Sequence, residues 1–237
     1  MSQISNSGTR RQWLFIALAG FFITNAVTAE LISNKLVDIP LSFNFFGGEI
    51  GPFVTIIGVL PWPVVFLVTD LINEFYGKQA IKRLSWITSA LIGYCFIIVV
   101  ISMAIPANTE VSAFTANDME YNKVFGQSRW IIVGSITAFL FSQILDTTLF
   151  AWIKSKTGNK MIWLRSTGST VISQLFDSFI VLYIGFVLPG TLSFKAFLQI
   201  APTNYVLKLI IAIALTPLIY VGHYAIRKYL REERSII

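Results

Sequence analysis

Apolar side chains form six long runs along the chain, separated by short polar segments. Each run can cross a hydrocarbon core about 30 Å thick, which takes roughly 17 to 25 helical residues. The runs cover residues 13–37, 51–73, 84–105, 130–153, 169–188 and 205–226. A helix in lipid satisfies its own backbone hydrogen bonds, so each run predicts one transmembrane helix. The pattern therefore predicts an all-α membrane protein, with residues 1–237 as one polytopic domain of six helices.

Polar residues interrupt two of these runs in the same way. Residues 142–146 read SQILD and residues 173–177 read SQLFD. A carboxylate near the middle of a membrane helix costs about 2.5 to 3.5 kcal/mol, so both acids call for a functional reason. Residues three or four apart share a helix face, and the two helices run in opposite directions. The stripes are therefore expected to meet about a local two-fold axis, as in transporters with inverted symmetry.

The second apolar run is expected to be broken near the middle of the membrane, at about the depth of the two SQxxD motifs. Trp62 lies at its centre, between Pro61 and Pro63, and prolines so placed kink or break a helix. Broken backbone at that depth borders either packed protein or a cavity, and both interpretations stay open. Counting from the span ends predicts one central substrate-binding site formed by Asn25, Trp62, Gln143, Asp146, Gln174 and Asp177. For the serine and glutamine residues, simple hydrogen bonding between helices is the alternative.

Two further polar groups lie nearer the span ends. Asp70, Asn73 and Glu74 share one face at the inner end of the second run and predict an inner gate or the floor of the cavity. Pairing with the basic residues that follow is the structural alternative. Glu30 and Asn34, four residues apart near the outer end of the first run, are the corresponding outer-gate candidates.

Composition and charge agree with a membrane location. The chain is 55% hydrophobic and 13% charged, with a mean hydropathy of +0.70, which is too apolar for an ordinary soluble domain. Most of its 18 Lys and Arg residues lie on segments that share a side with both termini. The positive-inside rule then predicts that both termini are cytoplasmic. Membrane lipids thus account for the basic charge, and no nucleic-acid partner is expected.

The sequence offers little for catalysis or cofactor binding. Cys95 is the one cysteine and His223 the one histidine, so thiol clusters and zinc-type histidine spacing are absent. The chain has no phosphate-binding glycine loop and no nucleophile elbow. We therefore expect neither an enzyme nor a cofactor or metal. The first outer loop, residues 38–49, predicts a turn or short hairpin, and the second, residues 106–129, a solvated loop with at most a short helix.

One stretch resembles a known family. Residues 63–77 read PVVFLVTDLINEFYG, and this run is similar to the signature of the queuosine precursor transporter family, also called the vitamin uptake transporter family. The likeness continues in FGQS at 125–128, WLR at 163–165, GST at 168–170 and both SQxxD motifs. The resemblance implies a bacterial inner-membrane importer of two queuosine precursors, 7-cyano-7-deazaguanine and 7-aminomethyl-7-deazaguanine. It also implies a six-helix body similar to the substrate-binding subunits of energy-coupling vitamin transporters.

The chemistry of such a ligand fits the candidate residues. A guanine-like edge presents adjacent N–H donors and a carbonyl, which a carboxylate and an amide can bind. Asp146 or Asp177, with Gln143 or Gln174, supplies both groups, and Trp62 can stack on the ring. One aspartate would then bind the purine-like edge, while the other meets the 7-substituent or stays protonated.

Several alternatives remain open at this point. The chain could be the ligand-binding subunit of an ATP-driven uptake complex for a vitamin or nucleobase. It could also be an intramembrane aspartyl hydrolase that uses Asp146 and Asp177 as a proton-sharing pair. The sequence does not decide between facilitated and proton-coupled transport, between the two precursors, or between a monomer and a homo-oligomer.

Overall fold

Within the part of the chain that the structure describes, six helical segments are long and apolar enough to cross a membrane, as predicted. The computed structural model describes residues 2–33, 35–40, 43–45, 48–50, 53–108, 116–126, 129–158 and 160–230. The long helices are α1 (Ser2–Ile32), α3 (Lys78–Ala104), α5 (Arg129–Thr157), α6 (Ile162–Leu182) and α7 (Phe194–Leu230). The shorter elements are the 3₁₀ turn η1 (Ile57–Val59), α2 (Trp62–Tyr76), α4 (Asp118–Phe125) and the π-helical turn η2 (Tyr183–Val187).

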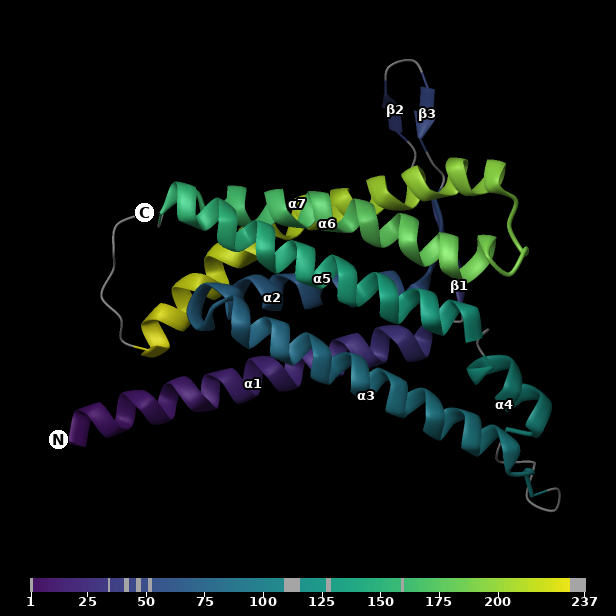
Figure 1. Cartoon of the computed structure of the whole chain (residues 1–237), viewed down its shortest axis with the longest axis horizontal. Coiled ribbons are helices and arrows are strands. Elements are labelled where there is room, and N and C mark those ends of the chain that lie inside the picture. Colours follow the sequence, from purple (N-terminus) through teal and green to yellow (C-terminus); the bar gives the residue numbers. More distant parts are fainter. Residues whose placement is uncertain are drawn as a thin grey trace.

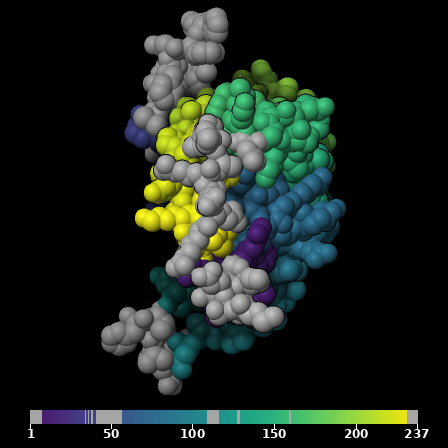
Figure 2. Space-filling model, turned by 90° about the vertical axis from the view of Figure 1, so that its left-hand side faces the viewer, coloured from purple at the N-terminus to yellow at the C-terminus, as the bar shows by residue number. Residues whose placement is uncertain are grey.

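The helices run side by side and mostly antiparallel, so the start of α1 and the end of α7 lie at the same end of the bundle (Figure 1). We call this the inner end, after the orientation that the charge pattern predicts, and the opposite end the outer end. Figure 2 looks at the inner end, where the yellow of α7 lies beside the green and blue parts of the bundle. An even number of crossings requires this placement of the termini.

The first outer loop contains two consecutive antiparallel strand pairs. Strand β1 (Leu36–Ile39) pairs with β4 (Phe53–Ile56), and β2 (Phe43–Phe45) pairs with β3 (Gly48–Ile50). The β2–β3 hairpin projects beyond the helices (Figure 1). The predicted hairpin is therefore present and longer than expected, and the all-α prediction is wrong for this loop. Residues 53–56 read FVTI, whose β-branched and aromatic side chains favour a strand over the predicted helix start.

The second membrane segment is broken where the prolines predict a break. Helix α2 begins at Trp62, after a turn at Leu60 and Pro61, and Pro63 occupies its first turn, where a missing N–H costs little. Its 15 residues extend about 22 Å, less than the roughly 30 Å of the hydrocarbon core. Trp62 therefore begins a helix inside the membrane rather than lying in the middle of one, and Asp70 follows two turns deeper.

The remaining helices differ from the predicted spans mainly at their ends. Helix α6 starts at Ile162 rather than at residue 169, and α7 extends from Phe194 to Leu230 with Pro202 and Pro217 inside it. Helix α4 is the short helix expected in the second outer loop, and a capping box of Asn117 and Glu120 begins it.

Burial separates a protein-facing side from a lipid-facing side. Phe22, Ile72, Ile92 and Phe139 form one buried cluster that joins α1, α2, α3 and α5. On α3, side chains such as Tyr94, Ile97 and Val100 are about 60% exposed, as expected for a surface that lipid covers. The polar side chains of the site lie on the inward faces of α2, α5 and α6.

Candidate functional site

The two SQxxD motifs meet across the α5–α6 interface and exchange hydrogen bonds. Ser173 Oγ on α6 donates to Asp146 Oδ1 on α5 at 3.1 Å, and Ser142 Oγ on α5 donates to Asp177 Oδ1 on α6 at 3.3 Å. Each serine thus binds the aspartate of the other motif. This reciprocal contact agrees with the meeting of the two stripes that the sequence predicts.

The two aspartates have different further partners. Asp146 is fully buried and also accepts a hydrogen bond from Thr170 Oγ1 at 3.3 Å, while its Oδ2 atom has no hydrogen-bond partner among the described residues. Asp177 forms an ion pair with Lys208 of α7, with Nζ and Oδ2 2.6 Å apart. Asp146 and Asp177 therefore bind different groups, which does not favour a proton-sharing catalytic pair.

The two glutamines also diverge. Gln143 is buried, and its Nε2 donates to Thr69 Oγ1 on α2 at 2.6 Å, so its amide joins two helices. Gln174 is 4% exposed and lines a pocket, and its Nε2 has no hydrogen-bond partner among the described residues. The structure therefore brings Gln174 to the pocket and leaves Gln143 behind its wall.

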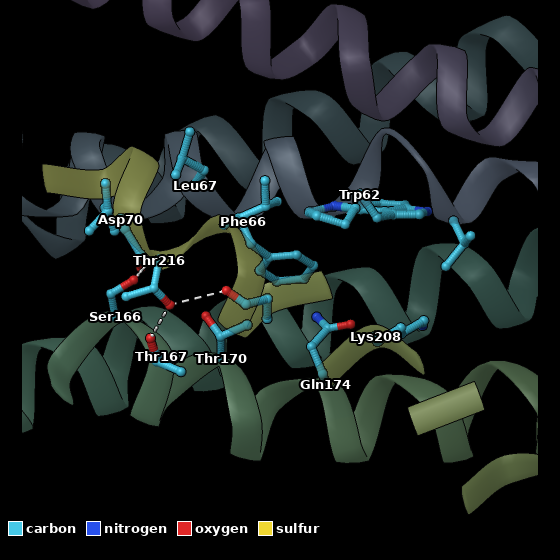
Figure 3. A pocket seen from close by; sticks show the side chains of 15 residues that line it. Trp62, Phe66, Leu67, Asp70, Ser166, Thr167, Thr170, Gln174, Lys208 and Thr216 are labelled. Carbon is cyan, nitrogen blue, oxygen red and sulfur yellow. Dashed lines mark hydrogen bonds between the residues drawn. The ribbon is translucent and has the colours of Figure 1, made fainter. Parts of the chain in front are cut away.

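A pocket lies between α2, α6 and α7 (Figure 3). Its lining includes Trp62, Phe66 and Asp70 of α2, Ser166, Thr170 and Gln174 of α6, and Lys208 and Thr216 of α7. Because α2 and α7 run inward and α6 runs outward, Trp62, Gln174 and Lys208 mark its outer end. Asp70 lies eight residues after Trp62 in α2, and Ser166 lies eight residues before Gln174 in α6. These two residues mark the inner end of the pocket, about 12 Å from its outer end.

The inner end of the pocket carries the carboxylate of Asp70. Its side chain is 3% exposed, and Ser166 Oγ donates a hydrogen bond to its Oδ2 atom. The Oδ1 atom of Asp70 has no partner among the described residues. Of the residues predicted to form a gate or floor, Asp70 is the one that reaches this pocket.

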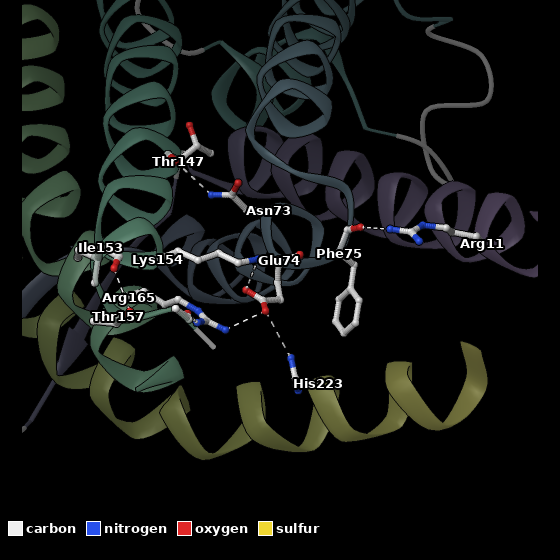
Figure 4. A network of polar contacts seen from close by, with 11 residues as sticks. Arg11, Asn73, Glu74, Phe75, Thr147, Ile153, Lys154, Thr157, Arg165 and His223 are labelled. Atoms are coloured by element: carbon white, nitrogen blue, oxygen red, sulfur yellow. Dashed lines mark hydrogen bonds and ion pairs between the residues drawn. The ribbon is translucent and has the colours of Figure 1, made fainter. Parts of the chain in front are cut away.

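A cluster of charged side chains lies at the inner end of the bundle around Glu74, one helical turn beyond Asp70 (Figure 4). Glu74 pairs with Arg165 of α6 at 2.8 Å and with Lys154 of α5 at 3.1 Å, and His223 of α7 lies 3.7 Å away. Arg165 is 1% exposed and also donates to the carbonyl oxygen of Gly158. Glu74 therefore joins three helices at the inner end of the bundle.

The other predicted residues lie outside this pocket. Asn73 Nδ2 donates to the carbonyl oxygen of Thr147, which links α2 to α5. Asn25 Nδ2 donates to the carbonyl oxygen of Phe21 one turn earlier in α1, and Asn25 does not line the pocket. Glu30 is buried and accepts a hydrogen bond of 2.5 Å from Ser135 of α5. Asn34 lies outside the described residues.

Sequence reasoning missed two charged residues. Lys208 was visible as the one cation inside the last apolar run, and a charge within a membrane span indicates a functional site. Arg165 was counted with the basic residues at the cytoplasmic side, because the run that follows was predicted to begin at residue 169. Its position in the first turn of α6, facing inward, depends on the helix start at Ile162.

The chain is similar to known membrane transporters. Residues 56–222, which contain the whole pocket, match the family described as "Putative vitamin uptake transporter". The chain is 31% identical over 182 residues to the "Probable queuosine precursor transporter" of Bacillus subtilis (strain 168), with 76% of this chain and 75% of that protein covered. It is 26% identical over 185 residues to the "Queuosine precursor transporter" of Escherichia coli (strain K12), with the same coverage. No solved structure matches the chain.

Proposed function

Because this chain belongs to the vitamin uptake transporter family, it is a multi-pass membrane transporter, and we propose that it imports a 7-deazaguanine precursor of queuosine. The two relatives are named for queuosine precursors. The proposed substrates are 7-cyano-7-deazaguanine and 7-aminomethyl-7-deazaguanine, carried across a bacterial inner membrane into the cytoplasm that holds both termini.

One observation carries this proposal. The pocket presents a buried acceptor, Asp70 Oδ1, and a buried donor, Gln174 Nε2, and neither has a partner among the described residues. A buried polar atom without a partner costs about 1 to 3 kcal/mol, so a ligand that pairs both atoms gains that energy on binding. A guanine-like edge has adjacent N–H donors for Asp70 and a carbonyl oxygen for Gln174, and because the two residues lie about 12 Å apart along the helices, both contacts require the side chains to converge around the ring.

The outer end of the pocket suits the rest of the ligand. Trp62 offers an aromatic face on which a flat heteroaromatic ring can stack. Lys208 can donate to the nitrogen of a 7-cyano group, and Asp177 can bind the ammonium of a 7-aminomethyl group. Asp146 and Gln143 then support the site from behind, since they hold α6 and α2 through hydroxyl groups.

Import requires this pocket to open. Its cavity volume is about 30 Å³, close to the share of one water molecule in the liquid, so a bicyclic base does not fit between the helices as they stand. Helix α7 carries both Lys208 and the internal prolines at 202 and 217, which makes it the element expected to move. The Glu74 cluster would close the inner end, and Glu30 with Ser135 the outer end.

Ligand binding to the purified protein tests the proposal. Either precursor should raise the melting temperature, whereas adenine, with an acceptor where guanine has N1–H, should not. Gln174→Leu should lower the affinity about tenfold or more, and Gln199→Leu, the same change at an exposed position of α7, should leave it unchanged. Failure of both precursors to stabilise or bind the wild-type protein would reject the proposal.

A second measurement separates transport by this chain from uptake through an ATP-driven complex. Proteoliposomes that contain the purified chain alone should take up the precursor without ATP. Binding without uptake, restored by a coupling protein and its ATPases, would instead identify the chain as the binding subunit of such a complex.

A further inference from the structure

Two buried carboxylates lie close together, one in the pocket lining and one behind it. Asp70 on α2 is 3% exposed and Asp146 on α5 is fully buried, and hydrogen bonds from Gln143 to Thr69 and from Asn73 to the carbonyl oxygen of Thr147 hold the two helices together on either side of these acids. Each accepts hydrogen bonds only from hydroxyl groups among the described residues, from Ser166 in the case of Asp70 and from Thr170 and Ser173 in the case of Asp146. No cation forms an ion pair with either carboxylate among those residues.

This region has more acceptors than hydrogens. Three buried oxygen atoms have no donor among the described residues, namely Asp70 Oδ1, Asp146 Oδ2 and Gln143 Oε1. Each hydroxyl carries a single hydrogen, and Ser173 Oγ lies 3.1 Å both from Asp146 Oδ1 and from the carbonyl oxygen of Thr170, so these hydroxyls have fewer hydrogens than acceptors. An added proton would turn one carboxylate into a donor and reduce this excess of acceptors.

The charged side chains around Asp70 and Asp146 also favour one added proton on this pair. Glu74 on α2, Arg165 on α6 and Lys154 on α5 are the charged groups nearest this side of the pair. Both cations bind Glu74, so two positive charges face three carboxylates, and His223 of α7, which is charged only when protonated, lies against Glu74 rather than against the pair. At the pocket's outer end Lys208 is paired with Asp177, and Glu30 of α1 faces that pair rather than Asp70. One proton on the Asp70 and Asp146 pair would balance the inner group.

We propose that Asp70 and Asp146 together bind one proton and that import of the ligand is coupled to the inward movement of this proton. The inference rests on the proposed function, because it needs a ligand that the pocket binds. Asp70 faces the ligand and Asp146 does not; a protonated Asp70 can accept from a ligand N–H and donate to the ligand's carbonyl oxygen, whereas the ionised form can only accept. Proton and ligand therefore favour each other's binding, by the same factor in each direction.

A proton suits this pair better than a sodium ion. Sodium requires a cage of oxygen lone pairs, whereas the hydroxyls of Ser166, Thr170 and Ser173 direct their hydrogens at the carboxylates. A proton also needs no volume, and Asp146 does not border the cavity.

Proteoliposomes with purified wild-type protein and a pH-sensitive dye inside test the inference. With the membrane potential clamped at zero and the outside one pH unit more acidic, a precursor should accumulate up to about tenfold. Its addition from outside should acidify the interior at the same rate as uptake, with or without sodium. A matched readout is exchange of labelled for unlabelled precursor at equal pH, which needs no net proton movement.

Variants assign the effect to the pair. Asp146→Asn removes the neighbouring charge that favours a proton on Asp70, so accumulation and acidification should be lost relative to the exchange measured on the same variant. Asp118→Asn, the same change at an exposed position in α4, should behave like wild type. If Asp146→Asn does not fold, the wild-type dye signal still decides the question.

The outcomes separate the two proposals. Wild-type exchange without any response to the pH gradient, or accumulation driven by a sodium gradient, would overturn proton coupling and leave the proposed function standing. Retention of proton-driven accumulation by Asp146→Asn would overturn the assignment to this pair. Absence of both exchange and binding in the wild type would mean that the proposed function itself fails.

Discussion

Replacement of Arg165 by glutamine should destabilise the protein more than any change at an exposed basic residue. The guanidinium is 1% exposed, lies 2.8 Å from Glu74 and also donates to the carbonyl oxygen of Gly158. Removal of one partner from a buried ion pair costs about 3 to 5 kcal/mol, because the other charge stays buried without it. Lys154 still contacts Glu74, so we expect the lower end, about 3 kcal/mol.

Thermal unfolding in detergent, followed by tryptophan fluorescence, measures this loss. For a chain of this size, 1 kcal/mol corresponds to about 2 to 4 °C, so Arg165→Gln should melt about 6 to 12 °C below wild type. Arg83→Gln is the control, since Arg83 is exposed near the same end of the bundle, and it should change the melting temperature little.

A double variant tests the pairing itself. If Arg165 acts through Glu74, then Glu74→Gln combined with Arg165→Gln should lose less stability than the sum of the two single changes. The reasoning is refuted if Arg165→Gln melts within about 2 °C of wild type. Strict additivity of the two changes would show that Arg165 stabilises the fold through something other than Glu74.

Three further predictions follow from the packing and the pocket. Trp62→Ala should weaken precursor binding by about 1 to 3 kcal/mol while Trp62→Phe retains most of the affinity, as titration calorimetry can show. Gly134→Ala should lower the melting temperature, because a Cβ atom there would lie 3.0 Å from the backbone nitrogen of Gly185, whereas Gly20→Ala, with nothing within 4 Å, should not. Lys208→Met should favour the 7-aminomethyl over the 7-cyano ligand in competition binding, since Asp177 then lacks its cation; an unchanged preference would exclude that contact.

The sequence predicts this fold well where apolar length decides the structure. Six runs give six membrane-spanning segments, because no other backbone structure of that length is stable in lipid. It fails at residues 53–56, which extend an apolar run but favour a strand by their side chains. It also places the start of α6 too late, because Arg165 and Ser166 are polar and their burial is not visible in a hydropathy pattern.

The candidate site could be predicted only in part, because helix packing, like burial, is not visible in a hydropathy pattern. Asp146 and Asp177 stand out as acids in apolar runs, but which helix each faces depends on packing. Asp70 was expected near the inner boundary of a span that starts at residue 51. Because α2 starts at Trp62 inside the membrane, Asp70 instead lies two turns into the bundle and beside the pocket. Among these three carboxylates, Asp70 is therefore the one that lines the pocket.

A different third helix lies beside each SQxxD motif, which explains how one repeated motif can serve two purposes. Both SQxxD motifs form the same serine contact across α5 and α6, so any difference between Asp146 and Asp177 must come from a third helix. For Asp177 that helix is α7, which supplies the cation of Lys208 and keeps the carboxylate paired. For Asp146 it is α2, which supplies a second acid in Asp70. Two adjacent carboxylates repel each other less when one of them carries a proton. The two motifs therefore meet different partners: Asp177 pairs with a lysine that lines the pocket, whereas Asp146 lies beside the acid with which we propose it shares a proton.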